Sequence, residues 1–372
     1  MIAPHLQDKY VNLYADCMPV AGACKSAIYD LTRREIVRFP SVYLHILQQA
    51  QQHTIGSVLS AVPDEASQKS VATFLHFLME NEFINLSVEV EKFPRIDEIW
   101  ERPSVIQNAI IDVNKELHDY ASLFQQLDML GCESVEIRCF SLLHTLDEIQ
   151  TIVHLTYHTS IQGVEILLKY DPRYDYIDYI KIVENEPIIA RLIVHSAPSD
   201  QEVMTTFDCD ENHASIMKHV KFVKEQLTSH KHCGVIQLST MNNPTTHLFF
   251  ENKLYNGCLN RKISIDQEGF VKNCPSMKTS FGHHKTVSLI EVVKNDVFKE
   301  MWYLHKDKIK KCQDCEFRYA CTDCRAYVED PHDRLSKPLK CGYDPYKGTW
   351  AQWHSQPEKD WVIKYYACEE ER

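Results

Sequence analysis

The stretch that decides the fold of this 372-residue chain is KCQDCEFRYACTDCR at 311–325. It holds two CxxC pairs, with five residues between the first pair and the second. Seven of the 14 cysteines fall between residues 258 and 341, and they are Cys258, Cys274, Cys312, Cys315, Cys321, Cys324 and Cys341. A CxxC pair puts two thiolates on one tight turn, where both reach the same metal centre. The pattern is therefore typical of a metal site rather than of core packing.

Composition and charge indicate a globular protein with enough chain for two or three domains. The net charge is −12. This argues against a nucleic-acid partner, because a duplex is densely negative and needs a basic face. No apolar run reaches the roughly 18 residues that span a bilayer, and the N-terminus lacks a signal-peptide pattern. We expect a cytoplasmic protein without a membrane partner, in which clustered cysteines stay reduced and favour metal over disulfides.

Residues 8–90 show the pattern of a small separate module. Strand-like runs at 12–16, 25–31 and 36–39 include a hairpin across the polar turn TRRE. Apolar residues at helical spacing then predict helices over 41–50, 53–62 and 70–84. A hairpin with three short helices is winged-helix-like, and we assign residues 1–100 to such a module.

Residues 104–239 alternate between strand and helix patterns. Strands are predicted over 104–113, 134–140, 163–170, 187–195 and 234–240. Helices are predicted over 119–131, 145–158, 174–186 and 212–227, with Gly131 ending the first and Thr145 and Glu148 forming a capping box at the second. This alternation implies an α/β fold with a parallel sheet. About five or six strands fall short of a complete eight-unit barrel, so we expect a degenerate partial barrel over 101–244.

Residues 245–372 are loop-rich around the cysteines, with one clear helix predicted over 288–304. The tail carries three of the five tryptophans and covers either the cysteines or the barrel. Seven thiols are one short of two complete four-cysteine sites. The missing ligand has four candidates, which are Cys209, Cys233, a carboxylate such as Asp323, and water.

The ligand set leaves the nature of the metal open. An array of cysteines without histidine suits iron–sulfur clusters, whereas paired CxxC knuckles also occur in structural zinc sites. Cations near such thiolates stabilise their negative charge or raise a cluster potential. The candidates for this role are Arg261, Lys262, Arg318 and Arg325. His283 and His284 are candidates to donate to a cluster or to bind substrate.

The spacing of Cys258, Gly269, Cys274, the group within 311–325 and Cys341 resembles the SPASM domain. That resemblance implies two auxiliary [4Fe–4S] clusters. It assigns cluster I to Cys258, Cys274 and Cys324, and cluster II to Cys312, Cys315, Cys321 and Cys341. The last pair is CxxC here where the family has CxxxC, a departure that bears on whether Cys321 and Cys324 serve different clusters.

The SPASM resemblance also gives meaning to the segments that precede the cysteines. Residues 8–90 are similar to the PqqD-like module, which binds leader peptides by strand addition, and the alternative is a generic winged helix packed on its own barrel. Residues 104–239 stand where a radical SAM barrel would be. That family needs CxxxCxxC after the first strand, but NKELHDYASLF at 114–124 contains no cysteine. We therefore expect no SAM chemistry.

Over most of its length the chain resembles the SPASM-domain peptide maturases of grasp-with-spasm systems. The matching motifs are PVAGACKSAIYDL (19–31), YNGCLNRKISID (255–266), KNCPSM (272–277) and KCQDCEFRYACTDCRAY (311–327). The resemblance implies a maturation factor for a ribosomally synthesised peptide, with the precursor peptide and an ATP-grasp ligase as partners. The alternatives are a redox enzyme acting on the peptide through an open cluster site, and a zinc-binding scaffold.

Overall fold

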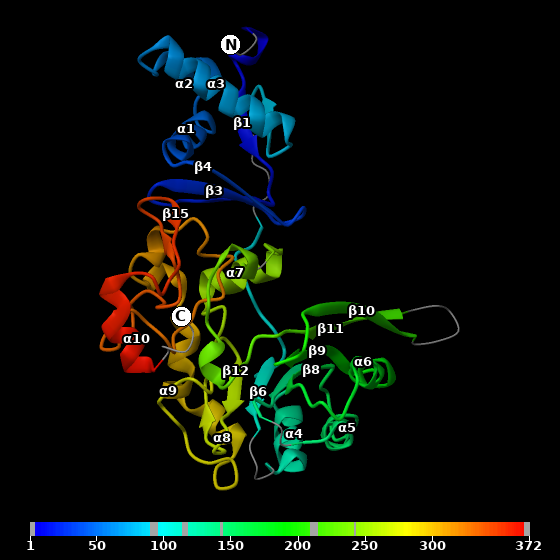
Figure 1. Cartoon of the computed structure of the whole chain (residues 1–372). Helices are drawn as coiled ribbons and strands as arrows, with labels where there is room; N and C mark the ends of the chain where they lie inside the picture. The colour runs from blue at the N-terminus through cyan, green and yellow to red at the C-terminus, as the bar shows by residue number, and fades with distance from the viewer. Residues whose placement is uncertain are drawn as a thin grey trace.

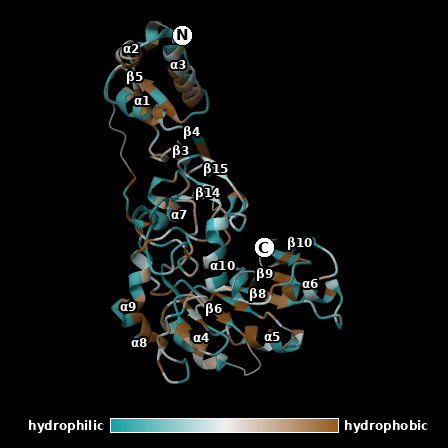
Figure 2. Ribbon diagram, turned by 60° about the vertical axis from the view of Figure 1, so that its left-hand side comes forward, coloured by the Kyte–Doolittle hydropathy of each residue, from teal (hydrophilic) through white to brown (hydrophobic). Residues whose placement is uncertain are grey.

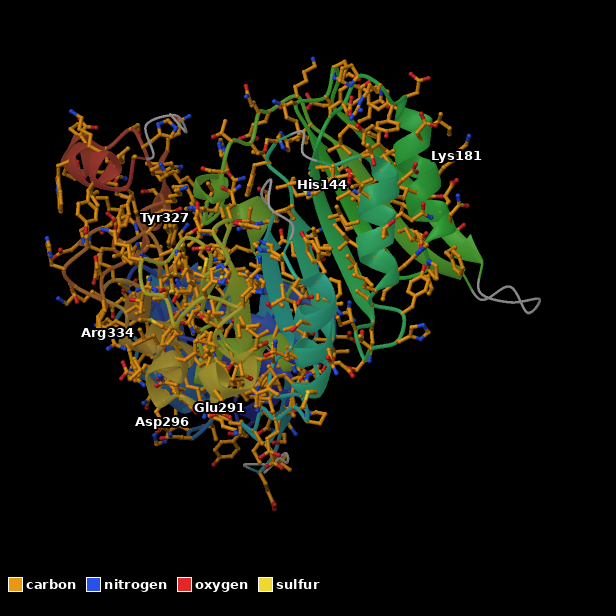
Figure 3. The ribbon with its side chains drawn as sticks, turned by 90° about the horizontal axis from the view of Figure 1, so that it is seen from below. His144, Lys181, Glu291, Asp296, Tyr327 and Arg334 are labelled. Carbon is orange, nitrogen blue, oxygen red and sulfur yellow. The ribbon has the colours of Figure 1, made fainter. Side chains whose placement is uncertain are left out.

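The computed structural model describes residues 4–89, 96–113, 118–141, 144–208, 215–241 and 243–367. Three parts follow one another along the chain: an N-terminal module, a helix-covered sheet and a cysteine-rich segment (Figure 1). Seen from below, His144 and Lys181 of the sheet part lie on one side of the molecule, and Tyr327 and Arg334 of the cysteine-rich segment lie on the other (Figure 3). In the described ranges, no helix is long and apolar enough to cross a membrane.

An eight-stranded sheet with the order β10-β11-β9-β8-β7-β6-β12-β13 forms the central part. Its strands are β6 (Asn108–Asp112), β7 (Ser134–Arg138), β8 (Gly163–Lys169), β9 (Ile189–His195), β10 (Gln201–Asp208), β11 (Ser215–Phe222), β12 (Lys262–Ile265) and β13 (Val271–Lys272). The six inner strands pair in parallel, and the two end strands pair antiparallel. The predicted α/β class with a mainly parallel sheet is therefore confirmed.

Three helices cover one face of this sheet, and they are α4 (Tyr120–Met129), α5 (Leu146–His154) and α6 (Tyr176–Asn185). Their apolar sides bury residues such as Leu123 and Ile149 against alternate strand residues such as Val135, and the apolar colour gathers in this layer (Figure 2). The predicted capping box forms, with the Thr145 N–H donating to the Glu148 carboxylate at 2.7 Å. Gly131 follows α4 with φ of 70°, as predicted for the end of this helix.

Two predictions in this part of the chain are wrong. The helix predicted over 212–227 is absent from its described part, residues 215–227, because Ser215–Phe222 forms strand β11 between β9 and β10; residues 212–214 lie outside the described residues. Residues 234–240 are not a strand, and Ile236 makes only an isolated bridge with Cys341. Local periodicity misleads at β11, where Lys218 is buried and its ammonium donates to the Val183 carbonyl at 2.7 Å. Hydrogen bonds to two neighbouring strands outweigh the helical pattern.

The N-terminal module contains the predicted hairpin and three helices. Strands β2 (Cys17–Val20), β3 (Lys25–Asp30) and β4 (Glu35–Pro40) form a sheet, and β1 (Tyr10–Leu13) pairs with β5 (Ile84–Ser87). The helices are α1 (Val42–Ala50), α2 (Ile55–Ser60) and α3 (Glu65–Glu80). Ser41 directly precedes α1, and its hydroxyl donates to the Gly22 carbonyl at 2.6 Å rather than capping the helix.

Both faces of the β2–β4 sheet are buried. Ile28 and Phe39 pack with the helices of the module. On the other face, Tyr29 packs with Phe249 of α7 (Thr246–Leu254) and with Tyr319 of the cysteine-rich segment. The Tyr29 hydroxyl donates to the Glu316 carbonyl at 2.7 Å. The N-terminal module is thus docked directly on the loop that carries the paired cysteines.

The cysteine-rich segment shares the sheet of the preceding part. Strands β12 and β13 extend it beyond β6, and α8 (Leu289–Lys294) buries Leu289 in the sheet core. The helix predicted over 288–304 is divided, because Asn295 is extended and caps a second helix, α9 (Asp296–Lys299), which a 3-10 turn follows. Strands β14 (Tyr343–Asp344) and β15 (Thr349–Trp350) and helix α10 (Asp360–Tyr366) complete it. The tail packs on this segment, with Ile363 against Tyr327 and Leu339.

Candidate metal centre

The structure brings Cys258, Cys274 and Cys324 together as one group of thiols. Burial raises the pKa of the Cys274 thiol to about 12, and the neighbouring Cys258 thiol adds to the rise. Burial likewise raises the pKa of the Cys324 thiol, and both Cys258 and Cys274 add to it. A neighbouring negative charge raises the pKa of a thiol only when it is close. These are the three residues that the SPASM resemblance assigns to cluster I.

The four remaining thiols of the array line a single cavity that is partly open to solvent. They are Cys312, Cys315, Cys321 and Cys341. Burial raises the pKa of Cys312 to about 12, with further contributions from Cys341 and Cys321, while the Lys306 ammonium opposes the rise. The rest of the wall combines apolar side chains, among them Ile236, Phe317 and Tyr343, with the cationic side chains of Lys306, Lys311, Arg318 and Lys337. The four cysteines are those that the SPASM resemblance assigns to cluster II.

The short CxxC at 321–324 spans both groups. Cys321 is buried beside Cys341, and Cys324 lies in the group of Cys258. Between them Asp323 adopts a left-handed backbone conformation with φ of 56°. Residues other than glycine rarely do so, although aspartate tolerates the region better than most. The resulting turn directs the two thiols to different groups despite the missing residue.

An eighth cysteine joins the first group, and it is Cys233. Its charge adds to the raised pKa of both Cys274 and Cys324. Burial is the largest cause of the raised pKa of the Cys233 thiol itself, followed by the Cys258 thiol. The residue as a whole is nevertheless exposed, so one side of it faces solvent. Of the other eighth-ligand candidates, Cys209 lies outside the described residues.

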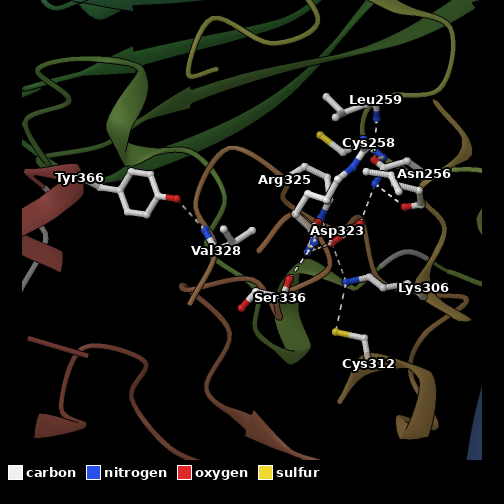
Figure 4. Close-up of polar contacts among 12 residues, drawn as sticks. Asn256, Cys258, Leu259, Lys306, Cys312, Asp323, Arg325, Val328, Ser336 and Tyr366 are labelled. Carbon is white, nitrogen blue, oxygen red and sulfur yellow. Dashed lines mark hydrogen bonds and ion pairs between the residues drawn. The ribbon is translucent and has the colours of Figure 1, made fainter. Parts of the chain in front are cut away.

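A buried chain of polar contacts connects the two groups (Figure 4). The Cys258 N–H donates to Asn256 Oδ1 at 3.0 Å, and Asn256 Nδ2 donates to Asp323 Oδ2 at 2.6 Å. Lys306 Nζ then lies 2.9 Å from Asp323 Oδ1 and 3.9 Å from the Cys312 sulfur. Arg325 closes the network, with its guanidinium 2.7 Å from Asp323 Oδ1. One carboxylate thus faces two cations midway between the thiol groups.

The candidate cations fall in different places. Lys262 Nζ lies 3.8 Å from the Cys258 sulfur. Burial lowers the pKa of this ammonium, whereas the negative charge of Cys258 raises it, and the net shift is upward. Arg318 lines the cavity of the second group and pairs with Asp307 at 2.8 Å. Arg261 instead donates to the Arg102 carbonyl at 3.1 Å, with its guanidinium over the Trp100 ring.

The contacts of His283 and His284 are with other side chains and with a turn of the sheet. The two rings stack on each other, and His284 also packs edge-on against His118 next to the end of β6. The His283 ring packs against Gly269, in the turn between β12 and β13. Burial lowers the pKa of the His284 imidazole to about 4.

Two positioning residues, Lys306 and Asn256, were not predicted from the sequence. Lys306 belongs to no motif, and Asn256 lies in the 255–266 motif without being singled out there. Each is recognised only by its contact with Cys312 or Cys258 in the fold. The buried ion pair of Arg138 with Asp112, at 2.6 and 2.9 Å, was also missed. It lies on the sheet face opposite the helices, and Arg138 acts electrostatically on Cys233. A polar residue at the end of a predicted parallel strand was the available signal.

Eight thiols fall into two groups of four, and a lysine ammonium lies within 4 Å of one sulfur in each group. Cysteine thiolates are the usual ligands of iron–sulfur clusters. Among the residues that the structure describes, no three or more His, Cys, Asp or Glu side chains are already arranged as a group that could hold a metal ion.

Comparison with known proteins gives only distant similarity. No protein-family model matches the sequence, and no curated protein matches it. The structure of SuiB from Streptococcus suis covers 85% of this chain and 96% of its own, at 10% identity and a TM-score of 0.29. SuiB bound to S-adenosylmethionine matches 88% of this chain and 98% of its own, with the same identity and TM-score. SuiB bound to its precursor peptide SuiA matches 85% and 96%, at 11% identity and a TM-score of 0.26. At these TM-scores the similarity carries no argument about chemistry.

Proposed function

We propose that this chain is a maturation factor for a ribosomally synthesised, post-translationally modified peptide. In this proposal it holds two [4Fe–4S] clusters, recognises the precursor peptide with its N-terminal module, and acts beside an ATP-grasp ligase without SAM radical chemistry. The observation that supports it most is the separation of the cysteines into two groups of four, one of them lining its own cavity. The family resemblance supplies the peptide and the ligase.

Iron–sulfur clusters bound at these thiols would supply electron transfer or a rigid cross-link between loops. The chain's own residues do the rest. Lys262 and Lys306 place positive charge beside one sulfur of each group, which stabilises negative thiolates. Asp323 balances Lys306 and Arg325, so that the cations between the groups remain paired.

The N-terminal module is suited to present a peptide close to the second group of thiols. Strand β4 is an edge strand of the β2–β4 sheet, and an extended peptide can add to such an edge through main-chain hydrogen bonds. Arg38 in this strand lies 3.6 Å from Glu316, which directly follows Cys315. A peptide bound along β4 would therefore lie next to the loop that carries the paired cysteines.

Anaerobic purification tests the metal part of the proposal. We expect about eight iron atoms and as many sulfides per chain, with a broad absorbance at about 400 nm. Colourless protein that carries zinc would instead support the scaffold function. The double variant C312S/C341S is expected to keep about half of the iron, since it removes ligands of one group only.

Calorimetry and affinity capture test the peptide part. The iron-loaded full chain is titrated with the precursor peptide and separately with a scrambled peptide of the same composition. We expect saturable binding of the precursor alone, and co-purification of the ATP-grasp ligase with the chain. Protein that holds its iron but binds neither partner contradicts a role in peptide maturation.

A further inference from the structure

The segment before the first predicted ligand runs directly into the first group of thiols. The 3-10 turn His230–His232 is followed by Cys233 and Gly234. His230 Nδ1 lies 3.1 Å from the Ser276 hydroxyl and 3.2 Å from the Tyr327 hydroxyl. Ser276 is two residues after Cys274, and Tyr327 is three residues after Cys324. One imidazole thus fixes this segment against the loops of both cysteines.

Gly234 brings the backbone next to Cys233 into contact with a sulfur of the group. A Cβ atom at this position would lie 2.9 Å from the Cys324 sulfur. The residue also adopts φ of 91°, in the region that favours glycine. A side chain here would collide with the Cys324 thiol, so the sequence Cys-Gly is what allows this approach.

A buried lysine holds the main chain of Cys233 in place. Lys340 Nζ donates to the Cys233 carbonyl at 3.0 Å and also to the Lys231 carbonyl. Lys340 has no accessible surface and directly precedes Cys341 of the second group. The Ile236 N–H donates to the Lys340 carbonyl at 3.0 Å. The segment is therefore anchored to the loop that carries Cys341 of the second group.

The carboxylate alternative has no free oxygen. Asp323 Oδ1 contacts both Lys306 and Arg325, and Oδ2 accepts from Asn256 Nδ2. Moving this carboxylate to a metal would leave two buried cations unpaired. Cys233 directly precedes the Gly234 backbone that approaches the Cys324 sulfur, whereas Asp323 is already engaged in an ion pair.

We propose that Cys233 is the fourth thiolate ligand of cluster I, so that every iron of both clusters has a protein ligand. This inference rests on the proposed function, since it requires that the first group holds a cluster. Its consequence is that neither cluster presents an open iron to a substrate. The peptide would then be handled by the protein surface or by electron transfer at a distance, and not by direct coordination.

The test compares anaerobically reconstituted wild type with C233A, and with C24A as a control that removes an exposed thiol elsewhere. Iron is counted, and EPR spectra of the reduced proteins are recorded before and after adding cyanide, which binds an iron that lacks a protein ligand. We expect about eight irons and no cyanide effect for wild type and C24A. For C233A we expect either a cyanide-dependent shift of one cluster signal or the loss of about half of the iron.

Two results overturn the inference. One is a C233A protein with full iron content and no response to cyanide, and the other is a wild-type protein that responds to cyanide. In both cases iron is bound, so the proposed function survives. A wild-type chain that takes up no iron at all overturns the proposed function and this inference together. G234A is a second variant, which keeps the Cys233 thiol but crowds Cys324, and it should reproduce the iron loss of C233A.

Discussion

Asp323 is the residue at which the two groups of thiols meet. Its carboxylate is 1% exposed, and it faces the Lys306 ammonium and the Arg325 guanidinium. The two cations lower the pKa of this carboxyl against the opposing effect of burial. A buried charge is tolerated only when paired, so this carboxylate determines whether two cations can remain between the two groups of thiols.

We expect Asp323→Asn to destabilise the protein strongly, because it leaves Lys306 and Arg325 buried without a counter-charge. Removing one partner of a buried pair costs about 3–5 kcal/mol. The free energy of unfolding is measured by denaturant titration under anaerobic conditions. Asp296→Asn is the control, since Asp296 is fully exposed, and a change of less than about 0.5 kcal/mol is expected there. Equal small effects for both variants would mean that the Asp323 network is not important for stability.

Substitutions of Cys321 and Cys324 should have separable effects although the residues are three positions apart. Cys321→Ser removes a thiol that lines the cavity of the second group, and Cys324→Ser removes one from the first. Each variant should lose about half of the iron, and the EPR signal that disappears should differ between the two. Loss of the same signal in both would show that the CxxC pair serves one cluster.

His195 makes the stability of the folded chain depend on pH. It is fully buried at the end of β9, and burial lowers the pKa of its imidazole to about 4. Because the unfolded residue has a pKa of about 6.5, the unfolded chain binds a proton that the folded chain excludes between these values. The contribution of neutral His195 is complete above about pH 6.5 and is lost as the pH falls towards about 4.

We therefore expect wild type to lose about 2 kcal/mol of unfolding free energy between about pH 7 and pH 5 through this residue alone. His195→Asn should lose less over the same interval, which urea titrations at the two pH values measure. His53→Asn is the control, because His53 is exposed. An identical pH dependence for wild type and His195→Asn would contradict the assignment.

At the scale of elements, the contact between the β2–β4 sheet and the cysteine loop depends on Gly22. A Cβ atom here would lie 3.0 Å from the Glu316 N and would overlap the Lys25 carbonyl oxygen. The Ala23 N–H, next in the chain, donates to the Asp314 carbonyl at 2.9 Å. Only glycine fits where two backbones approach this closely, because it has no Cβ atom.

Gly22→Ala should loosen the docking of the N-terminal module, because overpacking at such a contact costs about 1–3 kcal/mol. We expect faster amide exchange in residues 21–30 and 314–320, measured by hydrogen–deuterium exchange. Gly163→Ala is a matched control, since no atom lies within 4 Å of the added methyl group. Exchange that is unchanged by Gly22→Ala would argue against a tight contact at this position.

At the scale of the whole molecule, the clusters would act as the core of a segment that has little regular structure. Long loops bring residues from 233 to 341 to the two sites, and the apolar clusters beside them are small. Small or loop-rich units commonly need metal or disulfide cross-links to fold. The helix-covered sheet has a large apolar core of its own.

Removal of iron should therefore affect the molecule unevenly. With chelator under reducing conditions, we expect amide protection to fall in residues 233–241 and 311–345 and in the docked strands β2 and β3. Protection in α4, α5 and α6 should change much less, because that layer packs on the sheet core. Uniform loss of protection across the chain would show that the two parts unfold as one unit.

Local sequence signals determined much of this protein. Alternating strand and helix patterns predicted the parallel sheet and helices α4 to α6, and a capping box and a glycine marked helix ends at Thr145 and Gly131, because such signals act over a few residues. Cysteine spacing predicted seven of the eight grouped thiols. Only the tertiary structure decided the rest. Strand β11 exists because β9 and β10 flank it, and Cys233 joins Cys258 because Lys340 and Gly234 fold its segment inward. These contacts join residues far apart in the chain, where no local pattern records them.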